Sequence, residues 1–309
     1  MGAGHLERRD ITVSRKYEGI FVANTTPFKE DGTLDHEALR SEIDYLVDAG
    51  INGFFAAGTY GEGPMMSPDE FADYIETFST AVRKRVSVIA QVGATTLEQT
   101  IVQAKAAAYA GVDSIAAIPP YYYPHDDTAL FGFYSDLCEE AELPVFIYNN
   151  PYRSGNKISP ALFARLCQIP GIAGMKDSGG SLSDFCLYKM AAADKKDFHL
   201  LLGSDDMTLS GFVMGAPGAI AVLAAIFPEM FVKMYEAFKK GDLEAARDLQ
   251  YEAIKARMVL KRGPYISTYK AVLGMLGRQG GYSKKPVRMP SEEELESIRK
   301  SLRALGHLK

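Results

Sequence analysis

Residues 87–122 read SVIAQVGATTLEQTIVQAKAAAYAGVDSIAAIPPYY, and they contain the unit whose repetition decides the fold. Residues 87–94 form a nearly continuous apolar run, which is typical of a strand that helices cover on both faces. Apolar residues then recur at helical spacing over 97–110, and Gly111 ends the predicted helix. Because residues 114–122 form a second apolar run, this stretch predicts a strand, a helix and another strand.

The same unit recurs along most of the chain. Apolar runs of this kind occupy residues 19–28, 53–59, 87–94, 114–122, 144–151, 171–178, 198–206 and 218–225. Helical patterns separate the runs, for example over Leu39–Val47, after the capping box Ser67–Glu70, and over 128–142, 159–168, 181–196, 207–215 and 228–240. Eight strand–helix units in about 225 residues predict an α/β fold of the (β/α)8 or TIM barrel type.

A doubly wound open sheet is the alternative architecture. Such a sheet would usually carry a glycine-rich fingerprint after its first strand. The first predicted strand here is followed by Asn24-Thr25-Thr26-Pro27 instead. We therefore expect the barrel.

After Gly241 the pattern becomes purely helical. Three further helices are predicted, at residues 243–261, 266–279 and 291–305. The last begins with a capping box, Ser291–Glu294. We expect a catalytic barrel in residues 1–242, with a short N-terminal extension, and a C-terminal three-helix extension in residues 243–309 that packs on the barrel.

Composition excludes several classes of protein. The chain has 309 residues and a net charge of -5, which argues against binding nucleic acid through bulk positive charge. No run approaches the roughly 20 apolar residues of a membrane span, and residues 1–18 lack the apolar core of a signal peptide. The three cysteines, Cys138, Cys167 and Cys186, are few and widely spaced, so we expect buried, reduced thiols in a cytoplasmic protein.

In a barrel the chemistry lies where the strands end, and there Lys176 stands out. It is the one lysine or arginine within the eight apolar runs, and strand alternation places it on the same face as Gly174. If that face is the barrel interior, burial lowers the pKa of the amine, and a neutral amine can form a Schiff base with a carbonyl. The alternative is a structural lysine that pairs with Asp177.

Two hydroxyl groups could serve such an amine. Strand alternation aligns Tyr148 with Phe146, so its phenol can face the same interior and move protons; the alternative is a core tyrosine whose hydroxyl is satisfied. Thr59 aligns with Phe55 and could relay a proton to that phenol. The turn Gly58–Gly63 exposes backbone N–H groups that can hold a carboxylate.

Other barrel chemistries are poorly supported. The five histidines show no metal-ligand spacing, and acidic residues are missing from the ends of the third to fifth predicted strands, so we expect no metal site. A glycosidase would need two facing carboxylates, but the fourth strand ends in tyrosines. Asp205 and Asp206 would spoil a phosphate site. They suit hydroxyl donors, or at least one of them caps the helix predicted at 207–215.

Six motifs in order carry a family resemblance, namely GTYGE (58–62), PYYYP (120–124), YNNP (148–151), GMKD (174–177), GSDD (203–206) and GAI (218–220). From about residue 17 to residue 305 the chain resembles the dihydrodipicolinate synthase / N-acetylneuraminate lyase family of class I pyruvate-dependent lyases. The resemblance implies a Schiff base between Lys176 and pyruvate or another 2-keto acid, with Tyr148 as general acid/base. It implies a relay through Thr59 and Tyr122, the latter reaching into a neighbouring subunit's site.

The resemblance also implies the binding groups and the assembly. Backbone groups at Thr59 and Tyr60 hold the 2-keto acid carboxylate, and Gly203 and Ile220 offer backbone contacts near the substrate. An aldehyde is the second substrate, no cofactor is required, and the enzyme is a homotetramer built as a dimer of dimers.

The choice of family member depends on a few positions. Arg153 matches the arginine with which dihydrodipicolinate synthases bind the carboxylate of their second substrate; the alternative is a surface arginine that pairs locally. Tyr60 replaces a threonine of the synthase motif, whereas Asp205 and Asp206 match positions that contact polyol tails in sugar-acid lyases. The leading reaction is condensation of pyruvate with aspartate semialdehyde in lysine biosynthesis. The alternatives are an aldolase or dehydratase of 2-keto-3-deoxy sugar acids or 4-hydroxy-2-oxoglutarate, and a non-catalytic keto-acid-binding protein.

Overall fold

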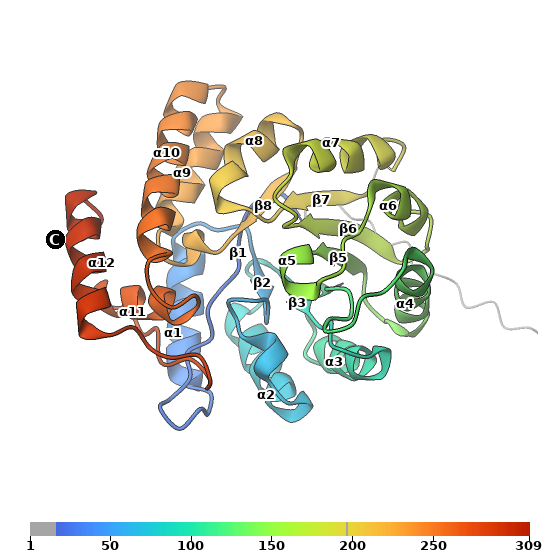
Figure 1. The fold of residues 1–309 in the computed structure, drawn as a ribbon, viewed down its shortest axis with the longest axis horizontal. Helices are drawn as coiled ribbons and strands as arrows, with labels where there is room; N and C mark the ends of the chain where they lie inside the picture. The colour runs from blue at the N-terminus through green and yellow to red at the C-terminus, as the bar shows by residue number, and fades with distance from the viewer. Residues whose placement is uncertain (1–16, 196) are drawn as a thin grey trace, which may run out of the picture.

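The computed structural model describes residues 17–195 and 197–309, and this part of the chain forms a closed barrel of parallel strands (Figure 1). The strands pair in sequence order, and the eighth returns to the first. They are β1 (Gly19–Val22), β2 (Gly53–Ala56), β3 (Ser87–Gln91), β4 (Ser114–Ala117), β5 (Val145–Asn149), β6 (Ile172–Asp177), β7 (His199–Leu202) and β8 (Gly218–Ala221). The predicted barrel is confirmed, and the open doubly wound sheet was the wrong alternative. The expected N-terminal extension lies in residues 1–16, outside the described residues.

Helices cover the outside of the barrel, one after each strand in the predicted order. They are α1 (His36–Asp48), α2 (Pro68–Val82), α3 (Leu97–Tyr109), α4 (Asp127–Glu140), α6 (Pro160–Leu166), α7 (Leu182–Ala191), α8 (Thr208–Val213) and α9 (Pro228–Lys239). The capping box predicted at the start of α2 is present, because Ser67 and Glu70 bond each other's backbone N–H groups. The sequence did not predict the short helix α5 (Pro151–Ser154), which follows β5 directly.

Aromatic rings fill the barrel interior, and glycines make room for them. A Cβ atom on Gly53 would lie 2.2 Å from the ring of Phe21, and one on Gly174 would lie 2.3 Å from the ring of Phe146. Both phenylalanines are fully buried. Gly174 therefore faces inward, and Lys176, two residues further along β6, points the same way.

The three helices predicted after the barrel are confirmed as α10 (Leu243–Leu260), α11 (Ser267–Met275) and α12 (Glu292–Ala304). They flank the barrel on the side of α1 and α9, with α12 outermost (Figure 1). The capping box at Ser291 and Glu294 is present as predicted. A fully buried ion pair between Glu62, in the turn after β2, and Lys270, on α11, joins the extension to the barrel.

Two further expectations concern the surface and the cysteines. Within the described residues, no helix has both the length and the apolar character needed to cross a bilayer.

All three cysteines are free, but only Cys167 is buried. Cys138 and Cys186 are half-buried, so the expectation of three buried thiols was wrong for these two. Burial raises the pKa of Cys138 and of Cys167 to about 12.

Candidate active site

A cavity of about 350 Å³ opens at the carboxyl ends of the strands. Its walls come from the turns after the strands, from α5 and from the C-terminal extension. Eight of the nine predicted site residues line it, namely Thr59, Tyr60, Tyr148, Arg153, Lys176, Gly203, Asp205 and Ile220. The fold thus brings together residues that are up to 161 positions apart.

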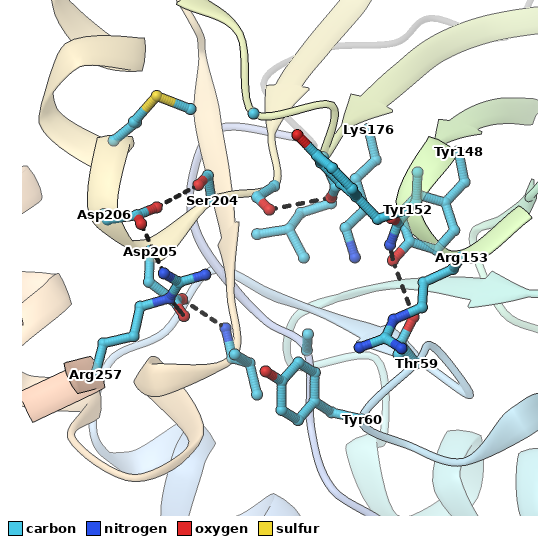
Figure 2. Close-up of a pocket in the computed structure, with 18 of the residues that line it drawn as sticks. Thr59, Tyr60, Tyr148, Tyr152, Arg153, Lys176, Ser204, Asp205, Asp206 and Arg257 are labelled. Carbon is cyan, nitrogen blue, oxygen red and sulfur yellow. Dashed lines mark hydrogen bonds and ion pairs between the residues drawn. The ribbon is translucent and has the colours of Figure 1, made fainter. Parts of the chain in front are cut away.

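Lys176 projects from β6 into the middle of this cavity (Figure 2). Its Nζ atom lies 3.6 Å from the ring centroid of Phe55 and 4.2 Å from that of Tyr148. Burial lowers the pKa of the amine, and the neighbouring Tyr148 phenol offsets part of this shift. The alternative pairing with Asp177 was wrong, because that carboxylate accepts hydrogen bonds from Asn149 Nδ2 at 2.8 Å and the Gly179 N–H at 3.0 Å.

Tyr148 carries its hydroxyl to the same place from β5. The hydroxyl lies 3.2 Å from Thr59 Oγ1 and accepts a hydrogen bond from Asn150 Nδ2 at 3.0 Å. Burial alone would raise the pKa of Tyr148, but the Lys176 ammonium and the hydrogen bonds to Thr59 and Asn150 bring it below its ordinary value. The Tyr148 hydroxyl therefore has hydrogen-bond partners, as the alternative of a core tyrosine expected, but these partners, Thr59 and Asn150, line the cavity.

Asn150 is a site residue that the sequence analysis missed. The signal was present, because residues 148 and 150 share one side of an extended segment. Their contact could not be read from that pattern, since Asn150 lies just beyond the end of β5 and its side chain turns back toward the phenol.

Thr59 reaches the cavity through a tight turn rather than by continuing the strand. β2 ends at Ala56, and Ala57 has a positive φ of 53°, so the expected alternation up to Thr59 was wrong. The turn requires glycine at Gly63, because a Cβ atom there would lie 2.0 Å from the Ala57 carbonyl oxygen. The turn places the hydroxyl of Thr59 beside Tyr148, and it directs the ring of Tyr60 toward the C-terminal extension.

Gly203 has no side chain, and this leaves room for the side chain of Lys176. A Cβ atom at this position would lie 2.2 Å from Ser178 Oγ and 3.0 Å from Lys176 Cε. The Gly203 N–H donates to the Asp177 carbonyl at 2.7 Å, and its carbonyl oxygen accepts from Ser178 Oγ at 3.0 Å. Its backbone groups are thus bonded within the protein, while the position itself lines the cavity.

The two adjacent aspartates have different surroundings, and neither caps α8, so that alternative was wrong. Asp205 is buried and accepts hydrogen bonds from the N–H groups of Val222 and Leu223 at 2.9 and 3.2 Å, at the end of β8. Asp206 is half-exposed and accepts a hydrogen bond from Arg257 at 2.6 Å. Burial raises the pKa of Asp205.

Arg257 was missed by the sequence analysis because it lies on α10, in the extension. Its Nε atom lies 3.6 Å from the carboxylate of Asp205, and its Nη1 atom donates a hydrogen bond to Asp206. Ser204 completes this wall of the cavity by donating to Asp206 at 2.5 Å. Burial alone would raise the pKa of Asp206, but Ser204 and Arg257 hold it below its ordinary value.

Arg153 lies across the cavity from Arg257 (Figure 2). It is exposed on α5, and its guanidinium carbon is 4.2 Å from the ring centroid of Tyr265, in the loop between α10 and α11. Within the described residues, no carboxylate pairs with it, and the local partner that the alternative expected is the ring of Tyr265. An unpaired guanidinium at the cavity can bind a carboxylate.

Tyr122 is the one predicted site residue that does not line the cavity. Its side chain is 84% exposed, its φ is 86°, and its ring packs edge-on against Tyr123. A smaller, apolar cavity of about 220 Å³ shares Thr59, Tyr148 and Arg153 with the first and is also lined by Tyr121. Within the described residues, no three His, Cys, Asp or Glu side chains are grouped so that they could hold a metal ion.

Comparisons with known proteins show the family of the chain. The model of the dihydrodipicolinate synthetase family matches residues 16–305. An N-acetylneuraminate lyase from Rhizobium meliloti is 33% identical over 287 residues, which cover 93% of this chain and 95% of the relative. A 4-hydroxy-tetrahydrodipicolinate synthase from Methanopyrus kandleri is 33% identical over 293 residues, which cover 94% and 97%.

The fold is shared as well. The crystal structure of YagE from E. coli K12, a prophage protein of the dihydrodipicolinic acid synthase family in complex with pyruvate, matches with a TM-score of 0.90 and 26% identity. The match covers 94% of this chain and 99% of YagE. Sequence and structure thus agree over nearly the whole chain, and the chain belongs to the dihydrodipicolinate synthetase family.

Proposed function

We propose that this protein is a pyruvate-dependent lyase that works through a Schiff base on Lys176. The observation that carries the proposal is the position of Lys176 Nζ, which is buried against the rings of Phe55 and Tyr148 at the cavity. Burial lowers the pKa of this amine, so more of it is in the neutral form that attacks a carbonyl carbon. Family membership supports pyruvate as the partner, since the relative YagE is in complex with it.

The reaction balances without a cofactor or a metal ion. The amine of Lys176 attacks C2 of pyruvate, and uptake of one proton with loss of one water leaves a protonated imine; hydrolysis of the imine at the end returns that proton. The imine draws electrons from C3, which loses a proton and becomes the nucleophilic end of an enamine. This carbon bonds to the carbonyl carbon of an aldehyde, whose oxygen takes up a proton. Water then hydrolyses the imine, releases the product and restores the amine; cleavage follows the same steps in reverse.

Protons in these steps pass through Tyr148, which lies within reach of both Lys176 and Thr59. Thr59 relays them, and Tyr122 of a neighbouring subunit completes the relay in a homotetramer built as a dimer of dimers. The strong exposure of Tyr122 supports a role in another copy of the chain. Backbone groups at Thr59 and Tyr60 hold the carboxylate of the keto acid.

The leading acceptor is aspartate semialdehyde, which makes the reaction that of 4-hydroxy-tetrahydrodipicolinate synthase, in lysine biosynthesis. Arg153 supports this choice, because its unpaired guanidinium at the cavity suits the carboxylate that aspartate semialdehyde carries. Synthases occur among the relatives at 33% identity.

A second candidate is an aldolase or dehydratase that acts on a 2-keto-3-deoxy sugar acid or on 4-hydroxy-2-oxoglutarate. The observation in its favour is the polar wall of Ser204, Asp206 and Arg257, whose donors and acceptors suit a chain of hydroxyl groups. The N-acetylneuraminate lyase among the relatives also supports a sugar-acid substrate. A non-catalytic keto-acid-binding protein is the candidate from another class.

Borohydride trapping tests the central step. Incubation with pyruvate and sodium borohydride should give a reduced adduct on Lys176, located by intact mass and peptide mapping. Lys176→Ala should give no adduct, and Lys157→Ala, at an exposed salt bridge with Asp184, serves as the matched lysine control. A folded parent protein that is trapped at another residue, or at none, would falsify the proposal.

The acceptor is identified by steady-state turnover. Pyruvate consumption with aspartate semialdehyde supports the synthase reaction. If aspartate semialdehyde is not turned over but pyruvate is released from 2-keto-3-deoxy sugar acids or 4-hydroxy-2-oxoglutarate, the second candidate replaces it. Arg153→Ala should raise KM for aspartate semialdehyde, on the order of tenfold or more, with little change in KM for pyruvate.

A further inference from the structure

Tyr265 lies at the cavity but has no role in the reaction proposed above. It comes from the loop between α10 and α11, its side chain is 45% exposed, and it lines the wall next to Arg153. Its ring centroid is 4.2 Å from the Arg153 guanidinium carbon. That distance is typical of a guanidinium stacked on an aromatic face.

Arg153 needs such a partner to hold one conformation. An exposed arginine has about 2 kcal/mol of side-chain rotamer entropy, and binding a carboxylate costs whatever part of that freedom is still present. Within the described residues, Arg153 has no carboxylate to orient it, and no side-chain hydrogen bond of its guanidinium is present. The ring of Tyr265 therefore provides the contact that orients the guanidinium.

Tyr265 is itself held in place by the barrel and by the extension. Its ring lies 4.9 Å from that of Tyr60, which comes from the turn after β2, and Tyr60 lies 4.8 Å from Tyr269 on α11. The buried Glu62–Lys270 ion pair fastens the same turn to the same helix. Three rings and one ion pair thus fix the surface on which Arg153 stacks.

We propose that Tyr265 is a positioning residue that holds Arg153 in the orientation that binds the carboxylate of the acceptor aldehyde. The C-terminal extension then sets the preference of the site for carboxylate-bearing acceptors. This inference rests on the proposed function, because the acceptor aldehyde reacts only with an enamine formed on Lys176.

The consequence is a change in discrimination between acceptors. Succinic semialdehyde and butanal have the same four-carbon chain, but only the former carries a carboxylate. Loss of the ring at position 265 should weaken binding of succinic semialdehyde and leave binding of butanal unchanged. Because Arg153 binds away from the reacting carbonyl, the loss should appear in KM and not in kcat.

The experiment measures pyruvate consumption with both aldehydes in five variants, namely Tyr265→Leu, Tyr265→Phe, Tyr251→Leu, Arg153→Ala and the double variant Arg153→Ala/Tyr265→Leu. Each is first shown to form the borohydride-trapped pyruvate adduct at the parent level. Tyr265→Leu should raise KM for succinic semialdehyde about 3- to 10-fold, the range expected for loss of a partly exposed cation–π contact and the entropy it removes. Tyr265→Phe keeps the ring and should match the parent. Tyr251→Leu, an exposed tyrosine on α10, is the matched control.

The double variant Arg153→Ala/Tyr265→Leu separates positioning from a direct contact. If Tyr265 acts through Arg153, then Tyr265→Leu should add nothing once Arg153 is alanine. Equal KM values for succinic semialdehyde in the parent and Tyr265→Leu, or a full additional loss in the double variant, overturn the inference. If Tyr265→Leu does not fold, Tyr265→Gln is judged by the same criteria. Failure of trapping in the parent instead refutes the proposed function.

Discussion

At the scale of single residues, the cavity changes the ionisation of two neighbouring groups in a way that suits proton transfer. Burial lowers the pKa of Lys176, and Lys176 in turn lowers the pKa of Tyr148. The hydrogen bonds from Thr59 and Asn150 add to the second shift, because an N–H or O–H that donates to the phenol oxygen favours its ionised form. Two groups that ordinarily titrate near pH 10 are thus brought closer to neutral pH.

The first prediction concerns Asn150. Replacing it with alanine removes a donor to the phenol oxygen, so the pKa of Tyr148 should rise and less phenolate should be present at pH 7. Enamine formation, measured as exchange of the pyruvate methyl protons with D2O by NMR, should slow roughly tenfold at pH 7 and recover as the pH is raised. The step in the pH profile that is absent in Tyr148→Phe is the titration of the Tyr148 phenol. An unchanged pH profile in Asn150→Ala would contradict the assigned hydrogen bond.

A second residue-scale prediction concerns Gly203. In Gly203→Ala the new methyl group would lie 2.2 Å from Ser178 Oγ, which must move, and 3.0 Å from Lys176 Cε, which must give way slightly. Trapping of pyruvate should slow by about threefold or more, because the reacting amine is pushed out of its position. Gly132→Ala on α4 is the control, because a Cβ atom there meets nothing within 4 Å. Parent-level trapping in Gly203→Ala would show that the space is not needed.

At the scale of elements, the turn after β2 and helix α11 form one unit. The turn contributes Thr59 and Tyr60 to the cavity, and the buried ion pair between Glu62 and Lys270 anchors it to the extension. Burial lowers the pKa of Lys270 to about 8, even though Glu62 partly offsets that shift. A lysine ammonium that is buried away from water destabilises the folded chain unless a carboxylate pairs with it.

Glu62→Gln should therefore lower the free energy of unfolding by about 3 kcal/mol at pH 7, because Lys270 stays buried without a carboxylate. The unfolded chain binds a proton at this lysine up to about pH 10.5, while the folded parent releases it near pH 8. Above pH 8 the parent also holds a neutral amine, so the difference between parent and variant should shrink by pH 9. Urea denaturation at both pH values measures this.

The exposed pair of Lys105 and Glu140 supplies the matched control for that experiment. Glu140→Gln should cost less than about 1 kcal/mol at either pH, because both partners are in contact with water. A loss in Glu62→Gln no larger than this control, or a loss that grows from pH 7 to pH 9, would contradict the anchoring role of the buried pair.

At the scale of the whole molecule, one chain brings eight of nine predicted residues together and leaves Tyr122 outside. The loop after β4 carries Tyr122 to the surface, with a backbone conformation that side chains rarely adopt. A strained and exposed aromatic residue fits a contact made in an assembly, as proposed for the relay between subunits.

Mixing two inactive variants tests this arrangement. Lys176→Ala removes the amine, and Tyr122→Phe removes the hydroxyl given to the neighbouring site. A mixed dimer contains one site with both groups intact, so random exchange of subunits should restore roughly a quarter of the parent activity. Each variant alone should be inactive or nearly so. No recovery in verified mixed dimers would contradict a relay between subunits.

The sequence by itself determined the barrel, the three C-terminal helices and the central pair of Lys176 and Tyr148. It could do so because these follow from local rules: apolar runs, capping boxes and strand alternation depend on residues close together in the chain. Alternation placed Lys176 on the same face of β6 as Gly174, and that face points into the barrel. Alternation was misleading only where the backbone leaves the extended region, as at Ala57 before Thr59.

Tertiary structure alone decided what surrounds that pair. Arg257 and Tyr265 line the cavity because the extension packs back on the barrel, and no local pattern specifies which residues of such an extension meet a site built from the ends of the barrel strands. In the same way Asp205, which the sequence assigned to substrate or to a helix cap, is held by the backbone at the end of β8. Hydrogen bonds and ring contacts between distant segments depend on how whole elements dock, and only the folded chain fixes those positions.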